Sequence, residues 1–168
     1  MVKLYLVRHG QTEDNVKQIL QGQMPGQLTQ EGVSEAERLC ERMKEVPIDV
    51  FVSSDLARAI DTCRIIAAPH GKEVVETPLL RERDWGDFTG AYIPDLKDRA
   101  WPDNVESAER MMARAKNFIT WLRVTYPEQT VLAVGHGIIN KMIQSVYYNK
   151  PMREIPRMEN AEVRVLLL

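Results

Sequence analysis

The sequence predicts a single α/β domain, a three-layer α/β/α sandwich with a mostly parallel central sheet. Short apolar runs typical of buried strands alternate with longer amphipathic stretches typical of helices along the whole chain. The chain has 168 residues, 44% hydrophobic and 27% charged, which suffices for one buried core. No internal repeat or linker divides residues 1–168. We therefore expect one domain.

The expected strands are short and apolar. Residues 4–7 form the first, and residues 49–53, 74–75, 130–134 and 162–168 form the others, with the last at a sheet edge. Residues 79–105 contain Gly86, Gly90, Pro94 and Pro102 and show no helical or strand periodicity. Irregular segments of this length in compact domains are usually functional or disordered. We expect residues 83–105 to be a lid over a binding site.

The expected helices begin at polar capping residues and show apolar positions three and four apart. They cover a short segment after residue 12, residues 30–44, a segment from residue 56 to 67, about 106–124, and 138–148. In the fourth helix, Met111 and Met112 are expected to fill the core. The expected capping residues are Thr12 or Asp14, then Thr29, then Ser54-Asp55.

Charge and composition exclude several classes of partner. The formal net charge of −2 gives no general attraction to nucleic acid or to an anionic membrane. No apolar run approaches the roughly 20 residues of a membrane span, and no secretory signal is evident. Two cysteines, Cys40 and Cys63, are expected to be free thiols in a reducing compartment. We expect a cytoplasmic protein with no nucleic-acid or membrane partner, and a homodimer is compatible with the sequence.

Charged and titratable side chains follow several of the expected strands directly. Arg8-His9-Gly10 follows the first strand, Ser53 to Arg58 follows the second, and Gly135-His136-Gly137 follows the fourth. Because the carboxyl ends of parallel strands share one rim, these groups are expected to converge. Arg58 lies in the first turn of a helix, where a cation opposes the helix dipole, which indicates a task other than helix stabilisation.

This convergence is typical of a phosphate site. Two arginines and two histidines form a local electropositive pocket in a mildly acidic protein. The chain has no GxxxxGK[ST] or GxGxxG nucleotide-binding motif, so an imidazole nitrogen is the expected nucleophile and Glu82 the candidate proton donor. A metal site formed by His9, His136 and a carboxylate is the competing chemistry. Adjacent guanidinium groups would repel the ion, so no metal or cofactor is expected.

At this point the chain resembles the histidine phosphatases of the phosphoglycerate mutase-like superfamily. Its motifs occur in the family's order and span nearly the whole chain: Arg8-His9-Gly10-Gln11-Thr12 with Asn15; Gln21-Gly22 with Leu28-Thr29-x-x-Gly32; Ser53-Ser54-Asp55-Leu56-x-Arg58-Ala59-x-x-Thr62; Leu80-x-Glu82-x-x-x-Gly86 with Gly90; and Gly135-His136-Gly137. The chain departs from the family pattern at Thr89, where a Glu is common, and at Asn104-Val105-Glu106-Ser107, where Gly-Glu-Ser is usual. These departures are expected to affect the rim of the site and substrate choice.

The resemblance implies roles for nine residues. His9 would be phosphorylated, Glu82 would donate the proton, and Arg8, Arg58 and His136 would complete the catalytic pocket. Substrate or phosphate contacts would come from Arg8, Asn15, Gln21, Gly22, Arg58, Glu82, His136 and Gly137.

The expected function is metal-independent hydrolysis of a small phosphorylated metabolite through a phosphohistidine. Three alternatives stay open: a cofactor-dependent phosphoglycerate mutase, a phosphohistidine-protein phosphatase, and a non-catalytic phospho-ligand binder. The binder is least expected because both His9 and Glu82 are present. A mutase needs an enclosed site, and the sequence offers only residues 83–105 as a lid and no tail after the last strand, which favours the phosphatase. Lys97, Arg99 and Lys141 are the cations that could contact an acidic substrate.

Overall fold

The computed structural model describes all residues 1–168 and shows a five-stranded sheet with the strand order β3-β2-β4-β1-β5. The strands are β1 (Lys3–Arg8), β2 (Val50–Ser54), β3 (Val74–Thr77), β4 (Thr130–Gly135) and β5 (Val163–Leu167). β1 to β4 pair in parallel, whereas β5 runs antiparallel beside β1 at the edge. The α/β class, the mostly parallel sheet and the edge position of the last strand are thus confirmed.

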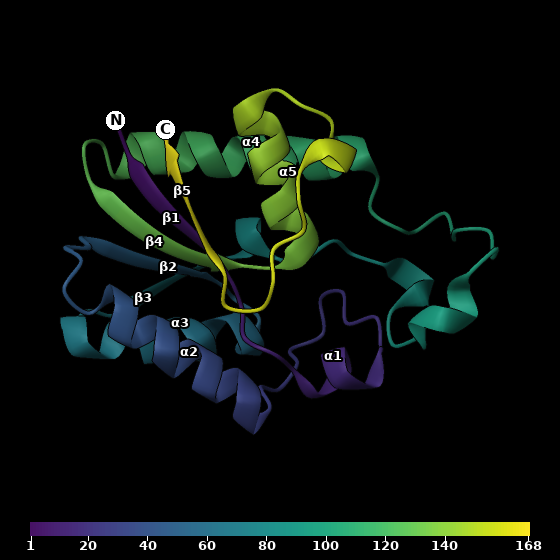
Figure 1. Cartoon of the computed structure of the whole chain (residues 1–168). Coiled ribbons are helices and arrows are strands. Elements are labelled where there is room, and N and C mark those ends of the chain that lie inside the picture. Colours follow the sequence, from purple (N-terminus) through teal and green to yellow (C-terminus); the bar gives the residue numbers. More distant parts are fainter.

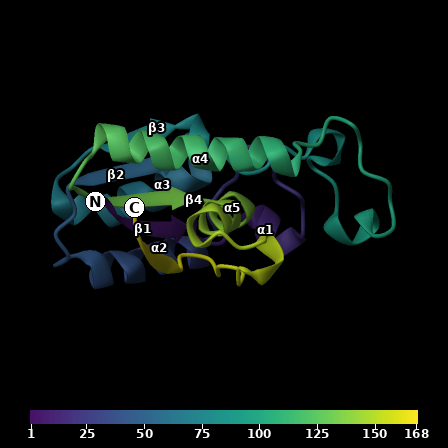
Figure 2. The same ribbon diagram turned by 90° about the horizontal axis from the view of Figure 1, so that it is seen from above.

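Helices cover both faces of the sheet (Figures 1 and 2). One face packs against α2 (Gln30–Met43) and α3 (Ala57–Ala67), with Val7, Phe51 and Leu132 among the buried strand residues. The other face packs against α4 (Ala108–Thr125) and α5 (Gly137–Tyr148), with Leu6 and Ala133 among theirs. Strands buried on both sides explain the continuous apolar runs of the sequence.

Two of the helix caps are those predicted from the sequence. Thr12 caps the short helix α1 (Glu13–Lys17) through a capping box with Asn15, and Thr29 caps α2 by accepting the Gly32 N–H at 3.0 Å. α4 is capped by Ser107, whose hydroxyl accepts the Arg110 N–H. Each side chain satisfies one of the N–H groups that a helix start leaves without a partner.

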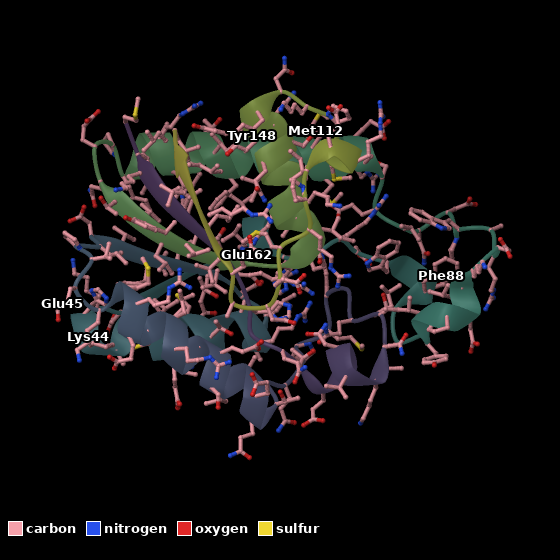
Figure 3. The ribbon with its side chains drawn as sticks, viewed as in Figure 1. Lys44, Glu45, Phe88, Met112, Tyr148 and Glu162 are labelled. Carbon is pink, nitrogen blue, oxygen red and sulfur yellow. The ribbon has the colours of Figure 1, made fainter.

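Two expectations about helices are wrong. α3 begins at Ala57 after Leu56, not at a Ser54-Asp55 cap, because Asp55 is engaged instead in a bidentate pair with Arg81 at 2.7 and 2.6 Å. Met112 is 39% exposed on α4 (Figure 3), while Met111 is fully buried. Consecutive helical positions point about 100° apart, so only one of the two methionines can face the sheet.

Residues 83–105 form an excursion that projects beyond the sheet and holds only the 3₁₀ turns η3 (Gly86–Phe88) and η4 (Ile93–Leu96) (Figures 1 and 2). Backbone hydrogen bonds tie it to residues 18–20, among them Gly90 N to Leu20 O at 2.8 Å and Ile93 N to Gln18 O at 2.8 Å. Phe88, labelled in Figure 3, is buried within the excursion. The segment is therefore a folded arm with its own contacts. No helix in the chain combines the length and apolarity needed to cross a membrane.

Candidate active site

The candidate site lies where β1, β4 and β2, three neighbouring parallel strands, end. Arg8 is the last residue of β1 and pairs in register with Gly135, the last residue of β4, while Ser54 ends β2. His9 and His136 follow β1 and β4 directly, and their ring centroids lie 5.1 Å apart. The sheet thus brings the predicted motifs together at its carboxyl rim.

His9 is buried with one ring nitrogen bonded and the other facing a cation. Its Nδ1 lies 2.7 Å from the Gly10 carbonyl oxygen, an acceptor that requires the proton to sit on Nδ1. Nε2 therefore carries the lone pair, which accepts a long hydrogen bond from Arg58 Nε at 3.4 Å. Burial and then the Arg58 charge lower the pKa of His9 well below its ordinary value. This is the state that a nucleophilic imidazole requires.

Gly10 allows close packing between the loop after β1 and α2. A Cβ at this position would lie 2.5 Å from the Gly32 carbonyl oxygen, which belongs to the first turn of α2. A Cβ on Gly32 would in turn lie 2.1 Å from the Gln11 carbonyl oxygen. The two glycines let the loop after β1 pack against α2, which fixes the backbone that holds His9.

Arg58 is a buried cation whose guanidinium is held by backbone carbonyls. Nη2 donates to Gly22 at 2.8 Å, and Nη1 donates to Met24 and, at 3.4 Å, to Pro25. Burial lowers the pKa of Arg58 to about 10, so the group stays charged at neutral pH. Because carbonyl oxygens and no carboxylate hold it, its full positive charge remains for an anionic ligand.

Arg8 and His136 complete the floor of the pocket. Arg8 Nη1 donates to the Met158 carbonyl oxygen at 2.7 Å, and its Nε is buried without a partner beside Gly137. His136 Nε2 lies 2.8 Å from Ser54 Oγ, while its Nδ1 is buried and unpartnered. Burial and the Arg58 charge lower the pKa of His136 well below its ordinary value. Unpartnered buried polar atoms on two neighbouring groups indicate a place for a ligand.

Glu82 reaches the site from a segment far from the strand ends in sequence. Its carboxylate accepts three backbone N–H bonds, from Arg83 at 2.9 Å, Ile138 at 3.0 Å and Ile139 at 2.9 Å. The last two belong to the first turn of α5, where the helix dipole favours a negative charge. Glu82 therefore sits beside the positive floor in an ordered position.

All the predicted site residues lie in or against one pocket of about 330 Å³. Eight of the nine line it directly, and His136 lies beneath, against His9. Asn15 lines the pocket while its Oδ1 accepts the Thr12 N–H of the capping box at 3.0 Å. The eight predicted residues that line the pocket are Arg8, His9, Asn15, Gln21, Gly22, Arg58, Glu82 and Gly137.

Arg157 and the apolar walls of the pocket were not predicted from the sequence. Arg157 lies in the loop before β5, which also places Asn160 Nδ2 3.1 Å from the His9 carbonyl oxygen. The place of this loop could have been inferred from the pairing of β5, because an edge strand antiparallel to β1 must start beside the carboxyl end of β1. The apolar walls are Ile19, Leu20, Trp85, Ile93 and Ile138.

The family departures are not themselves among the residues that line the pocket. Asn104 Oδ1 accepts the Asp87 N–H at 3.0 Å and Asn104 Nδ2 donates to Asp87 Oδ1 at 2.9 Å, which joins the two ends of the excursion. Glu106 forms a half-buried pair with Arg114 at 2.8 Å. A Cβ on Gly22 would lie 3.2 Å from Thr89 Oγ1, so Thr89 lies beside a residue that lines the pocket. The influence of both departures on substrate choice stays a prediction.

The three-ligand metal set weighed from the sequence is not assembled. No three His, Cys, Asp or Glu side chains of the chain come together in a metal-binding group. The site is instead a set of cations and two imidazoles beside one carboxylate, on the sheet rim of an α/β sandwich. Such a set can bind a phosphate group and place an imidazole nitrogen beside it.

Comparison with known proteins identifies the family. The model of the histidine phosphatase superfamily (branch 1) matches residues 4–168. A probable phosphoglycerate mutase GpmB of Proteus mirabilis is 36% identical over 82% of this chain and 71% of its own length. The uncharacterized phosphatase PhoE of Bacillus subtilis is 31% identical over 96% and 86%. The chain therefore belongs to the histidine phosphatase superfamily, branch 1.

A solved structure supports the same conclusion. A mycobacterial glucosyl-3-phosphoglycerate phosphatase, determined with vanadate, superposes with a TM-score of 0.88 at 28% identity. The match covers 98% of this chain and 92% of that one. Relatives of the chain thus include both phosphatases and proteins named as mutases.

Proposed function

We propose that the protein is a metal-independent phosphomonoesterase that acts through a phosphohistidine on a small phosphorylated metabolite. The observation on which this rests is the environment of His9 in the pocket: the Gly10 carbonyl oxygen fixes Nδ1, and the unprotonated Nε2 faces Arg58, whose Nε donates to it at 3.4 Å. A volume of about 330 Å³ is in the range of small-molecule sites, which favours a metabolite over a phosphoprotein.

The proposed reaction has two displacements at phosphorus. His9 Nε2 forms a bond to phosphorus while the bond to the ester oxygen breaks, and Glu82 gives a proton to that oxygen. Water then attacks the phosphohistidine, gives its proton to the Glu82 carboxylate, and breaks the N–P bond. Arg8, Arg58 and His136 stabilise charge on the phosphoryl oxygens in both steps.

The apolar walls fit a substrate with an organic body. Trp85, Ile93 and Ile19 surround the space beyond the cationic floor, and such surfaces bind carbon skeletons while a few polar groups fix orientation. The cytoplasmic location, the homodimer, and the lack of nucleic-acid and membrane partners stay predictions from the sequence.

The test is replacement of the nucleophile. His9→Asn keeps an amide donor for the Gly10 carbonyl but has no imidazole, so we expect hydrolysis of an aryl phosphate to fall about 10³-fold or more. Brief mixing with substrate followed by an alkaline quench and mass spectrometry should find phosphate on His9 in the native protein alone. Unchanged circular dichroism in the variant serves as the folding control. Phosphate on another residue would overturn the proposal.

A further inference from the structure

We infer that the pocket contains a second oxyanion site, formed by Lys141 and Arg157, for an anionic group on the alcohol part of the substrate. The inference rests on the proposed function and narrows its substrates to phosphate monoesters with an additional carboxylate or phosphate. Both groups present the same chemistry to a cation, namely a charged oxygen.

Lys141 and Arg157 come from different elements but line the same pocket as His9. Lys141 lies one helical turn after Gly137, at the start of α5. Arg157 lies between η5 (Met152–Glu154) and β5, in the loop whose Met158 carbonyl oxygen holds Arg8. The loop and the helix therefore bring two cations to the phosphate site from its side.

Neither cation has a partner of its own. None of the six ion pairs in the structure includes Lys141 or Arg157. Glu162, the labelled carboxylate near this loop in Figure 3, pairs with Arg164 at 2.7 Å. The guanidinium of Arg157 and the ammonium of Lys141 thus keep their charge for a ligand.

The charge of the lining exceeds what one phosphate can balance. Four cationic side chains face the pocket, and Glu82 is the single carboxylate among its lining residues. A phosphate monoester brings at most two negative charges, and Arg8 and Arg58 flank the nucleophile where it must bind. The Arg157 charge also acts, after burial, to lower the pKa of Arg8. A second anion would relieve this repulsion, since opposite charges a few ångströms apart attract each other.

Lys97 and Arg99, the other two cations predicted to contact an acidic substrate, lie outside the pocket. Lys97 and Arg99 lie in the excursion, and neither lines the pocket. The Arg99 guanidinium lies 5.9 Å from the Phe88 ring centroid instead. Of the three cations predicted for an acidic substrate, only Lys141 is therefore in place, and Arg157 joins it.

The experiment compares phenyl phosphate with 4-carboxyphenyl phosphate and with the 1,4-bisphosphate of hydroquinone. We expect the native protein to favour the two substrates with a second anionic group over phenyl phosphate in kcat/KM by about tenfold, equivalent to about 1.4 kcal/mol. Arg157→Gln and Lys141→Gln should each reduce this ratio to about threefold, and the double variant should abolish it. A preference for the bisphosphate alone identifies the second group as phosphate, and a preference for the carboxylated ester alone identifies it as carboxylate.

Arg153→Gln is the matched control, because Arg153 belongs to the same C-terminal loop but does not line the pocket. Arg153→Gln should leave the kcat/KM preference for the second anionic group unchanged. If this variant loses as much of the preference as Arg157→Gln, the effect comes from long-range charge and the proposed second site is wrong. Calorimetry with benzylphosphonate and 4-carboxybenzylphosphonate gives the same comparison without turnover. If no ester is hydrolysed but the carboxylated phosphonate binds tighter in native protein than in Arg157→Gln, the phosphatase proposal fails and the second site stands. Equal binding of the two phosphonates by native protein contradicts the second site.

Discussion

At the scale of single residues, burial sets the state of the two histidines. His9 and His136 are both buried beside Arg58, and both have a pKa lowered well below the ordinary value by burial and then by that charge. The same environment that keeps Nε2 of His9 unprotonated for attack makes protonation of either ring costly to the fold. Catalytic readiness and acid sensitivity thus have one cause.

The first prediction concerns stability against pH. A histidine whose folded pKa lies below its unfolded pKa binds more protons when unfolded, so stability is complete above about pH 6.5 and falls as the pH drops below it. Each histidine contributes a slope of up to about 1.4 kcal/mol per pH unit. Urea unfolding between pH 5 and 8 should show this decline, and His136→Asn should reduce its slope by up to half. A flat profile in native protein would contradict the burial argument.

Glu82 provides a second residue-scale prediction. In Glu82→Gln the side chain cannot donate or receive the proton, yet its remaining oxygen can still accept the N–H groups of Arg83 and Ile139, which bond to Oε1 in the native protein. We expect alkyl phosphates, whose leaving groups need protonation, to lose about 10²-fold or more in kcat, and 4-nitrophenyl phosphate to lose less than about tenfold. Steady-state rates on both esters measure the difference. Equal losses would assign Glu82 to positioning.

At the scale of elements, the strand ends could be predicted from sequence and the loops could not. Arg8-His9 and His136 follow clear apolar runs, and parallel pairing then fixes their convergence. Glu82, Trp85 and Arg157 lie in segments without periodicity, whose positions depend on contacts distant in sequence. The backbone hydrogen bonds between residues 18–20 and 90–93 are one such contact, and no local sequence pattern predicts them.

The excursion offers a prediction of its own. The Arg83 guanidinium lies 5.0 and 4.9 Å from the ring centroids of Trp85 and Trp101, which contact each other edge-on at 5.2 Å, and Trp85 lines the pocket. Because Trp101 does not line the pocket itself, Trp101→Ala should act only by loosening this stack, worth about 0.5–1 kcal/mol at an exposed site. We expect KM to rise about two- to fivefold with little change in kcat, and faster proteolysis within residues 83–105.

Tyr148→Ala, which removes an exposed aromatic ring from α5 on another part of the surface (Figure 3), is the control for this variant. It should change neither KM nor the cleavage rate of the excursion. If Trp101→Ala behaves like the control, the stack does not support the pocket wall, and the excursion has no part in substrate binding.

At the scale of the whole molecule, two arms extend the sheet rim into a pocket. The excursion is bonded to residues 18–20, and the loop before β5 is bonded to β1 through Arg8 and His9. Each arm is therefore held to its own side of the site. Between them they supply the apolar wall and Arg157, while the sheet supplies the nucleophile and its cations.

This arrangement separates hydrolysis from mutase chemistry. A mutase must keep its phosphohistidine from water while the intermediate reorients, which requires closure over the site. Here Arg157, an exposed side chain, borders the pocket on one side, and the excursion is fastened on the other. Water is expected to reach the phosphoryl group before a sugar acid can accept it.

We therefore predict that phosphate release from the best monoester exceeds interconversion of 2- and 3-phosphoglycerate at least tenfold, and that 2,3-bisphosphoglycerate does not stimulate either rate. Parallel assays of phosphate release and of phosphoglycerate isomerisation test this, with His9→Asn as the blank for both. A mutase rate above the hydrolysis rate would show that the two arms close together during turnover.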